Sequence, residues 1–79
     1  MKVEVKYFAA LREVAATSSE VVETTATNAV ELYAELDSKY QFGIVQDNLK
    51  VAINECYVDF STVLKENDTV VFIPPVAGG

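Results

Sequence analysis

The sequence has no histidine or tryptophan, and its 79 residues include one cysteine, two prolines and three glycines. Without histidine, neither a Ser-His-Asp nor a Cys-His catalytic arrangement can form. Gly43 stands alone, and Gly78 and Gly79 are the last two residues, so the chain has no glycine-rich phosphate loop. Carboxylates and the single thiol do not cluster with the spacing of metal ligands. These absences argue against catalysis by the chain's own side chains and predict no metal site.

Basic residues are also scarce. The chain has 6 Lys+Arg against 12 Asp+Glu, a formal net charge of −6. Nucleic acids and anionic membranes both attract a basic surface, so we expect neither as a partner. No apolar run approaches the roughly 20 residues of a membrane-spanning helix. Lys2, Glu4 and Lys6 interrupt the start of the chain and argue against a signal peptide. A lone cysteine, Cys56, forms no internal disulfide, and we expect a cytoplasmic protein.

The length fits one small domain, and 51% of the residues are hydrophobic. Residues 2–8 alternate, which predicts a strand with Val3, Val5 and Tyr7 on one face and Phe8 at the end of the solvent-facing one. Helix-forming residues predict a short helix over 9–15, followed by a break at 17–19. The run 20–24 then predicts a second strand beside the first.

The clearest helix begins after Asn28, a good N-cap with Glu31 three residues later, as in a capping box. An apolar stripe at helical spacing follows, and Gly43 marks a stop shortly after the helix. Residues 49–54 predict a third strand, with Asn54-Glu55 as the tip of a hairpin into 56–58. The apolar run 69–73 is typical of a strand in the middle of a sheet. The order of elements indicates an α+β domain with four to five strands around one main helix. The stripe comprises Ala29, Leu32, Tyr33, Leu36 and Tyr40.

The composition changes over the last six residues, where both prolines and two of the three glycines lie and no charged side chain occurs. Pro74 ends the strand, and two consecutive prolines favour an extended, semi-rigid segment. Glycine lets a backbone approach a partner closely, so the tail suits chemistry on its own terminal carboxylate. The alternative interpretation is an ordinary frayed end. We predict a domain over 1–73 and an extended tail over 74–79, whose residues are Pro74, Pro75, Val76, Ala77, Gly78 and Gly79.

Four segments resemble one known family, the small subunits of molybdopterin synthase. The double proline before the terminal Gly-Gly is the most specific of them, because a bare Gly-Gly is shared with other sulfur carriers and with ubiquitin-like modifiers. The resemblance covers essentially the whole chain, and it departs from the family in lacking a glycine turn at 66–68. The matching segments are residues 7–13 (Tyr-Phe-Ala-Ala-Leu-Arg-Glu), 51–54 (Val-Ala-Ile-Asn), 64–68 and 71–79.

The resemblance implies a ubiquitin-like β-grasp fold and a sulfur carrier that is not an enzyme by itself. It implies that an ATP-dependent adenylyltransferase activates the carboxylate of Gly79, and that sulfur then replaces AMP to leave a thiocarboxylate. It further implies that the tail enters the active site of the large subunit, in a heterotetramer of two small and two large subunits, and donates sulfur to a cyclic pyranopterin precursor. The product is the dithiolene of molybdopterin, and no cofactor is bound permanently.

The resemblance also places Phe8, Tyr57 and Ile73 at positions that face a partner, although Ile73 could equally belong to the core. Arg12 could bind a partner carboxylate or pair with a surface acid. Cys56 lies in a predicted strand with no cationic neighbour in sequence, which favours a structural thiol over a sulfur relay. Other hypotheses are a sulfur carrier for thiamin or cysteine synthesis, a protein modifier that forms isopeptide bonds through Gly79, and an interaction domain with an inert tail.

Overall fold

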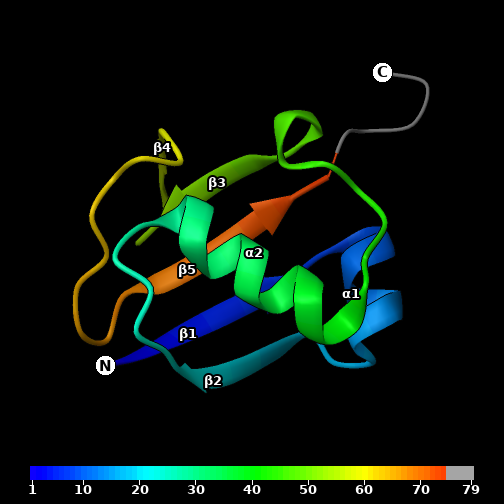
Figure 1. The fold of residues 1–79 in the computed structure, drawn as a ribbon, viewed down its shortest axis with the longest axis horizontal. Coiled ribbons are helices and arrows are strands. Elements are labelled where there is room, and N and C mark those ends of the chain that lie inside the picture. Colours follow the sequence, from blue (N-terminus) through cyan, green and yellow to red (C-terminus); the bar gives the residue numbers. More distant parts are fainter. Residues whose placement is uncertain (75–79) are drawn as a thin grey trace.

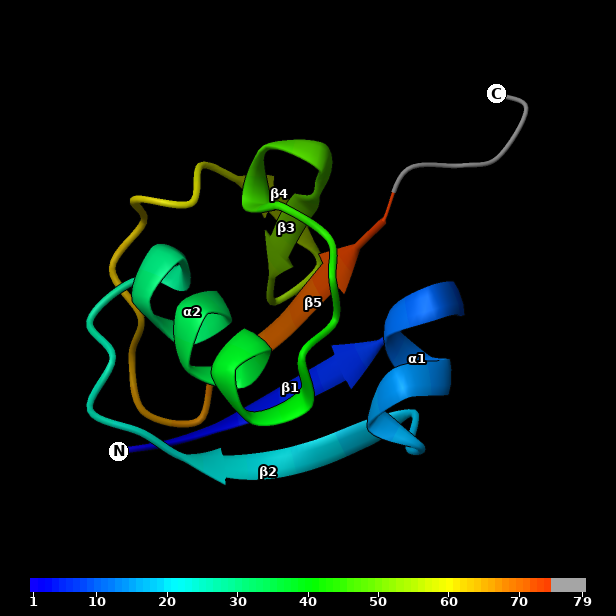
Figure 2. The same cartoon turned by 45° about the vertical axis from the view of Figure 1, so that its right-hand side comes forward.

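A computed structural model describes residues 1–74. Its five strands form one mixed sheet in the order β2-β1-β5-β3-β4, in which β1 and β5 are parallel and the other neighbours antiparallel. Helix α2 crosses one face of this sheet (Figures 1 and 2). The predicted α+β class, with one main helix, is therefore confirmed. The elements are β1 (Lys2–Tyr7), α1 (Ala9–Ala15), β2 (Ser19–Glu23), α2 (Ala29–Tyr40), the 3-10 helix η1 (Gln46–Asn48), β3 (Lys50–Ile53), β4 (Cys56–Val58) and β5 (Thr69–Ile73).

The core lies between α2 and the face of the sheet that α2 covers, which we call the inner face. Strand alternation puts Val3, Val5 and Tyr7 of β1 there, each at most 1% exposed. The apolar stripe of α2 packs against them, and Tyr40 at its end is partly buried. The central position predicted for 69–73 is confirmed, since β5 lies between β1 and β3.

Helix α2 begins as predicted, but the details of both ends differ. The Asn28 side chain accepts a hydrogen bond from the backbone N–H of Glu31, at 2.9 Å. The Glu31 carboxylate accepts from the N–H of Thr27, at 2.7 Å, and so caps one residue earlier than a standard capping box. At the other end Gln41, and not Gly43, takes the left-handed conformation that caps the helix, with φ 59°.

The second strand also begins one residue earlier than predicted, at Ser19, because that residue pairs with Lys6 at the end of the β1–β2 ladder. The predicted hairpin tip is confirmed. Asn54 and Glu55 both have positive φ, 51° and 73°, as a two-residue hairpin turn requires.

Two of the segments behind the family resemblance meet at the end of the sheet near the N-terminus. Asp68 is buried, and its carboxylate accepts hydrogen bonds from the Asn54 side chain (2.9 Å) and from the backbone N–H of Lys65 (2.8 Å). The Asn54 side-chain oxygen in turn accepts from the N–H of Thr69, at 3.0 Å. These bonds tie the β3–β4 hairpin to the turn before β5, in which Asn67 has φ 69° without being glycine.

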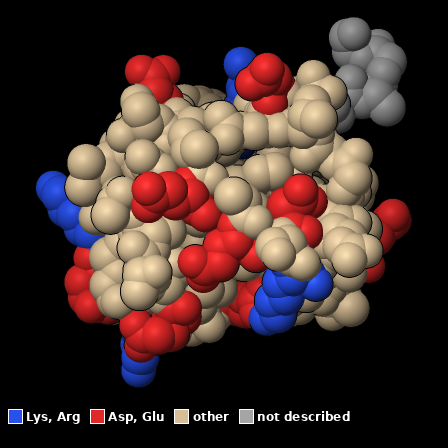
Figure 3. All heavy atoms as spheres, in the orientation of Figure 1, with Lys and Arg blue, Asp and Glu red and all other residues tan. Residues whose placement is uncertain are grey.

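Charge is unevenly distributed over the surface. Acidic side chains gather across the α2 side of the molecule (Figure 3). On α2 itself Glu31 and Glu35 are exposed and Asp37 is half-buried. Because the polar side of an amphipathic helix faces solvent, this side of the molecule carries much of the excess negative charge.

Candidate functional site

The predicted tail begins where β5 ends. Ile73 is the last residue of β5 and pairs with Lys50 of β3, and Pro74 follows outside the strand. Proline cannot donate to the ladder, which explains the end of the strand. Residues 75–79, including the predicted reactive Gly79, lie outside the described residues. The structure therefore fixes the position from which the tail starts.

Phe8 lies at the same end of the sheet, directly after β1. Tyr7 pairs with Phe72 in the parallel β1–β5 register and is buried, whereas Phe8 is 49% exposed. Ala9 then adopts φ 50°, an unusual conformation for a residue with a side chain. This backbone turn starts α1 immediately and leaves the Phe8 ring in solvent, as the alternation of residues 2–8 predicts.

Tyr57 is on the short edge strand β4 and is 71% exposed. It pairs with Ala52 of β3, which in turn pairs with Val71 of β5. All three residues belong to the face of the sheet opposite α2, which we call the outer face. Ile73 belongs to this face too and is half-buried, and its contact with a partner stays a prediction.

A pocket of about 360 Å³ brings Tyr57 and Ile73 together beside the start of the tail. Phe8 does not line this pocket. It follows the Tyr7–Phe72 pair, so continuing that register puts it beside Ile73 on the neighbouring strand. The three predicted interface residues thus share one end of the outer face. The pocket is lined by Asp47, Asn48, Leu49, Lys50, Tyr57, Ile73 and Pro74.

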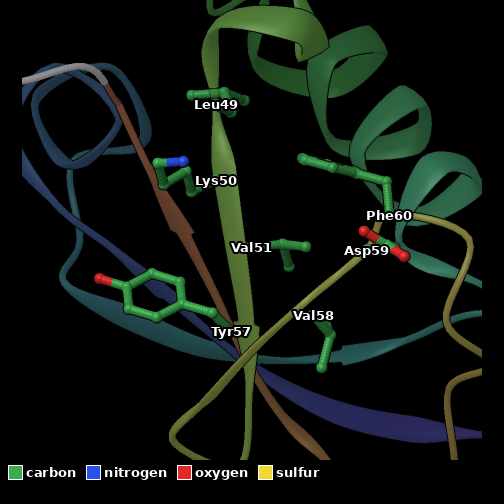
Figure 4. Close-up of a pocket in the computed structure, with 7 residues that line it drawn as sticks. All are labelled: Leu49, Lys50, Val51, Tyr57, Val58, Asp59 and Phe60. Atoms are coloured by element: carbon green, nitrogen blue, oxygen red, sulfur yellow. The ribbon is translucent and has the colours of Figure 1, made fainter.

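A larger pocket of about 520 Å³ lies along β3, β4 and the segment after β4 (Figure 4). Lys50 and Tyr57 lie on one side of β3, while Val51, Val58 and Phe60 lie on the other. Neither Lys50 nor Phe60 is among the site residues predicted from the sequence. The alternation Leu49-Lys50-Val51 nevertheless indicates that the lysine lies on the outer face.

A hydrogen-bonded group on the inner face, formed by residues of β1, β2 and α2, holds this end of the sheet in place. The hydroxyls of Tyr7 and Tyr40 both donate to the Glu20 carboxylate, each at 2.6 Å, and the Lys39 ammonium lies 3.8 Å from it. Burial opposes ionisation of Glu20, but the bonds from Tyr40 and Tyr7 and the charge of Lys39 outweigh burial and lower its pKa. Burial, followed by the bond to Glu20, raises the pKa of Tyr7. Both tyrosines therefore stay neutral donors, and Tyr7 anchors the backbone from which Phe8 projects.

Other candidate features in residues 1–74 are few. They contain no group of three or more His, Cys, Asp or Glu residues that could hold a metal ion. No helix in this part of the chain has the length and hydropathy to cross a membrane. Cys56 is in a strand, as predicted, but it is exposed. Arg12 is exposed and forms no salt bridge with any residue up to Pro74.

Comparison with known proteins decides the family. The profile of the ThiS family matches residues 5–79, which include the whole predicted tail. This chain belongs to the ThiS family. Curated relatives named molybdopterin synthase sulfur carrier subunit include one from Drosophila melanogaster, 40% identical over 83 residues, covering 100% of this chain and 92% of the relative. Another, from Mycobacterium tuberculosis, is 39% identical over 84 residues, covering 100% and 99%.

Solved structures agree on the fold. A putative molybdopterin converting factor subunit 1 from Pyrococcus furiosus has a TM-score of 0.80 at 30% identity, with 96% of this chain and 99% of that chain covered. Subunit 1 in the complex of subunits 1 and 2 of molybdopterin-converting factor from Helicobacter pylori has a TM-score of 0.71 at 29% identity, with both chains fully covered. The small archaeal modifier protein 1 from Methanosarcina acetivorans reaches 0.81 at 26%, with 99% and 96% covered. The ubiquitin-like β-grasp fold and the resemblance to molybdopterin synthase small subunits are thereby confirmed.

Proposed function

We propose that this chain is the sulfur carrier subunit of a molybdopterin synthase. Its similarity to curated sulfur carrier subunits over its full length carries this proposal. The tail that starts at Pro74 supports it, because a segment without charged or bulky side chains can enter a narrow partner site with little desolvation penalty apart from that of its terminal carboxylate. The described residues, with no histidine and no metal-binding cluster, also suit a carrier whose catalytic groups belong to its partners.

The chemistry takes place on Gly79. A terminal carboxylate has an ordinary pKa of about 3.3–3.7, so it is ionised and a poor electrophile. Its attack on the α-phosphate of ATP releases pyrophosphate and gives an acyl adenylate, a mixed anhydride with AMP as leaving group. A sulfur donor displaces AMP and leaves a thiocarboxylate. The sulfur of this soft nucleophile displaces an oxygen substituent from a carbon of the pyranopterin precursor, which links the carrier to the precursor as a thioester. Water then cleaves the bond between the Gly79 carbonyl carbon and sulfur, which leaves the sulfur on the precursor and restores the carboxylate, so two loaded carriers supply the two sulfurs of one dithiolene.

The tail and the outer face have different tasks in this proposal. We expect the two prolines to keep the reactive end away from the domain, and the two glycines to leave its carbonyl unhindered. Docking of the domain through Phe8, Tyr57 and Ile73 converts sulfur transfer into a reaction between held groups at high effective concentration. The catalytic pocket lies in the large subunit, in a heterotetramer of two small and two large subunits. An adenylyltransferase consumes the ATP, and a cytoplasmic location fits a chain with one unpaired cysteine.

Intact mass spectrometry tests the proposal most directly. The full chain is incubated with ATP, an adenylyltransferase and a sulfur donor, and we expect the mass to rise by the exchange of one oxygen for sulfur at Gly79. The control is the chain without Gly79, which should keep its fold and lose sulfur transfer to the precursor. The proposal fails if the shortened chain still supports molybdopterin formation, or if the full chain is never thiocarboxylated.

A second candidate is a protein modifier, favoured by the similarity to the archaeal modifier protein. In that case the activated Gly79 would form an isopeptide bond with a lysine of a target protein. Both functions share the adenylation step, so they differ in what happens afterwards. Lysine-linked conjugates in cells that express the tagged chain would support the modifier, whereas co-purification with a large synthase subunit would support the carrier.

A further inference from the structure

The outer face separates its charges along the strands, and this separation bears on the partner in the proposed function. At the end near the N-terminus, Lys2 lies close to two acids, Glu4 and Glu23. In the β-ladders Glu23 pairs with Lys2 itself, and Glu4 pairs with Val21 of β2 and with Thr69 of β5. Glu23 is further neutralised by the N-terminal ammonium, at 2.8 Å. At the end where the tail begins, the charged residues of the strands on this face are the exposed lysines Lys6 and Lys50.

These two lysines border an apolar strip, which consists of Val71, Ala52 and Tyr57 in one row of the outer face and of Phe8 and Ile73 in the next. Lys6 on β1 pairs with Val71 of β5, and the same row continues through Ala52 of β3 to Tyr57 of β4. Lys50 pairs with Ile73 one row nearer the tail. The strip is therefore two rows deep and centred on β5. Lys6 stands at the β1 end of the first row, and Lys50 stands at the β3 end of the second.

Lys50 also lines the pocket of about 360 Å³ beside Pro74, together with Tyr57 and Ile73. An apolar wall and a cation thus meet at the point where the tail starts. Asp47 is the one carboxylate in that lining. Up to Pro74, neither Lys6 nor Lys50 forms a salt bridge within the chain.

Net charge and local charge predict opposite partners. With a net charge of −6 and acids gathered over α2, the molecule as a whole attracts a basic surface (Figure 3). The tail end of the outer face instead offers lysines around apolar side chains. We infer that the large-subunit surface docking here is an apolar ridge flanked by carboxylates, and that Lys6 and Lys50 select it. This inference rests on the proposed function.

The inference has a measurable electrostatic signature. Charges at the rim of an interface act mainly on association rate, specificity and salt dependence. Replacing either lysine by glutamate sets like charges against each other, and we expect the Kd to rise about tenfold at low ionic strength. The difference should shrink in high salt, because exposed charges are screened over about 10 Å at 0.1 M.

The experiment measures binding of the full chain to the large subunit, at low and high salt, for Lys6→Glu and Lys50→Glu. Lys65→Glu is the matched control, since Lys65 is an exposed lysine in the loop before β5, outside the strip. It changes the net charge equally, and we expect its Kd to stay within about twofold of the wild type. Lys50→Arg should bind like the wild type, and circular dichroism checks that every variant is folded.

The outcomes separate this inference from the proposed function. If Lys65→Glu weakens binding as much as the other two, net charge decides and the inference is wrong. It is also wrong if Lys6→Glu and Lys50→Glu bind as tightly as the wild type, or more tightly, while the wild type binds and transfers sulfur. A wild-type chain that neither binds a large subunit nor becomes thiocarboxylated would overturn the proposed function itself.

Discussion

Similar side chains are buried on one face of the sheet and exposed on the other. Tyr7 and Phe72 lie on the inner face and are each 1% exposed, whereas their neighbours in sequence, Phe8 and Ile73, belong to the outer face. Phe8 is 49% exposed and Tyr57 reaches 71%. Since aromatic side chains occur on both faces, the difference lies in the covering element, α2. Apolar burial on the inner face stabilises the fold, and apolar exposure on the outer face is available for a partner.

The sharpest way to break this comparison is to truncate one phenylalanine on each face. Phe72→Ala removes a ring that packs against Tyr33, with ring centroids 5.3 Å apart, and should lower the free energy of unfolding by about 3–5 kcal/mol. Phe8→Ala removes a half-exposed ring and should cost about 1 kcal/mol or less. Urea unfolding of both variants measures the difference. Equal losses would mean that Phe8 is a core residue and not an interface residue.

The outer face can then be tested through binding. Tyr57→Ala should leave the unfolding free energy nearly unchanged, because the side chain is largely exposed. In binding to the large subunit we expect a loss of about 2 kcal/mol, the size typical of a buried tyrosine at the centre of an interface. Calorimetric titration measures it, with Val63→Ala as the control. Val63 is 66% exposed but lies in the loop after β4, in contact with the start of α2 through a bridge to Asn28. Unchanged affinity of Tyr57→Ala would remove Tyr57 from the interface.

Much of this division could be predicted from the sequence. The alternation of residues 2–8 separates Tyr7 from Phe8, and the apolar stripe after Asn28 identifies the helix that covers the inner face. The central position of β5 follows from its uninterrupted apolar run, although Val71 and Ile73 are half-buried because the described residues put no helix over them.

What the sequence could not predict depends on contacts between distant residues. The hydrogen bonds from Tyr7 and Tyr40 to Glu20 join β1, α2 and β2, and none of these three residues is close in sequence to another. The pocket beside Pro74 needs η1, β3, β4 and β5 together. Local pattern gives the face on which Lys50 lies, but only the register of β3 with β5 puts it beside Ile73.

The inner face differs from the outer face in a second respect, because hydrogen bonds to Glu20 hold it together in addition to apolar contacts. Glu20→Gln keeps the shape and an acceptor but loses the charge, and we expect a loss of about 1–2 kcal/mol in unfolding free energy at neutral pH. The pKa of Glu20 is lowered in the folded chain, so its contribution is present above the ordinary value of 4.5 and disappears as pH falls through the lower folded value. The wild type and the variant should therefore converge in stability in acid. A difference between them that stays constant from neutral to strongly acidic pH would contradict this assignment.

Cys56 should give the smallest effect, because it is exposed although its pairing puts it on the inner face, and because it lies outside the apolar strip. It is exposed at the start of β4, where it pairs with Ile53 at the closed end of the hairpin. The pocket beside Pro74 is lined from β4 by Tyr57 and not by Cys56. We expect Cys56→Ser to change stability by less than about 0.5 kcal/mol and to support sulfur transfer at the wild-type rate. The measurement compares molybdopterin formed per thiocarboxylated chain for the variant and the wild type. A folded Cys56→Ser variant that accepts sulfur on Gly79 but cannot pass it on would make the thiol a relay and move part of the chemistry from the tail to the domain.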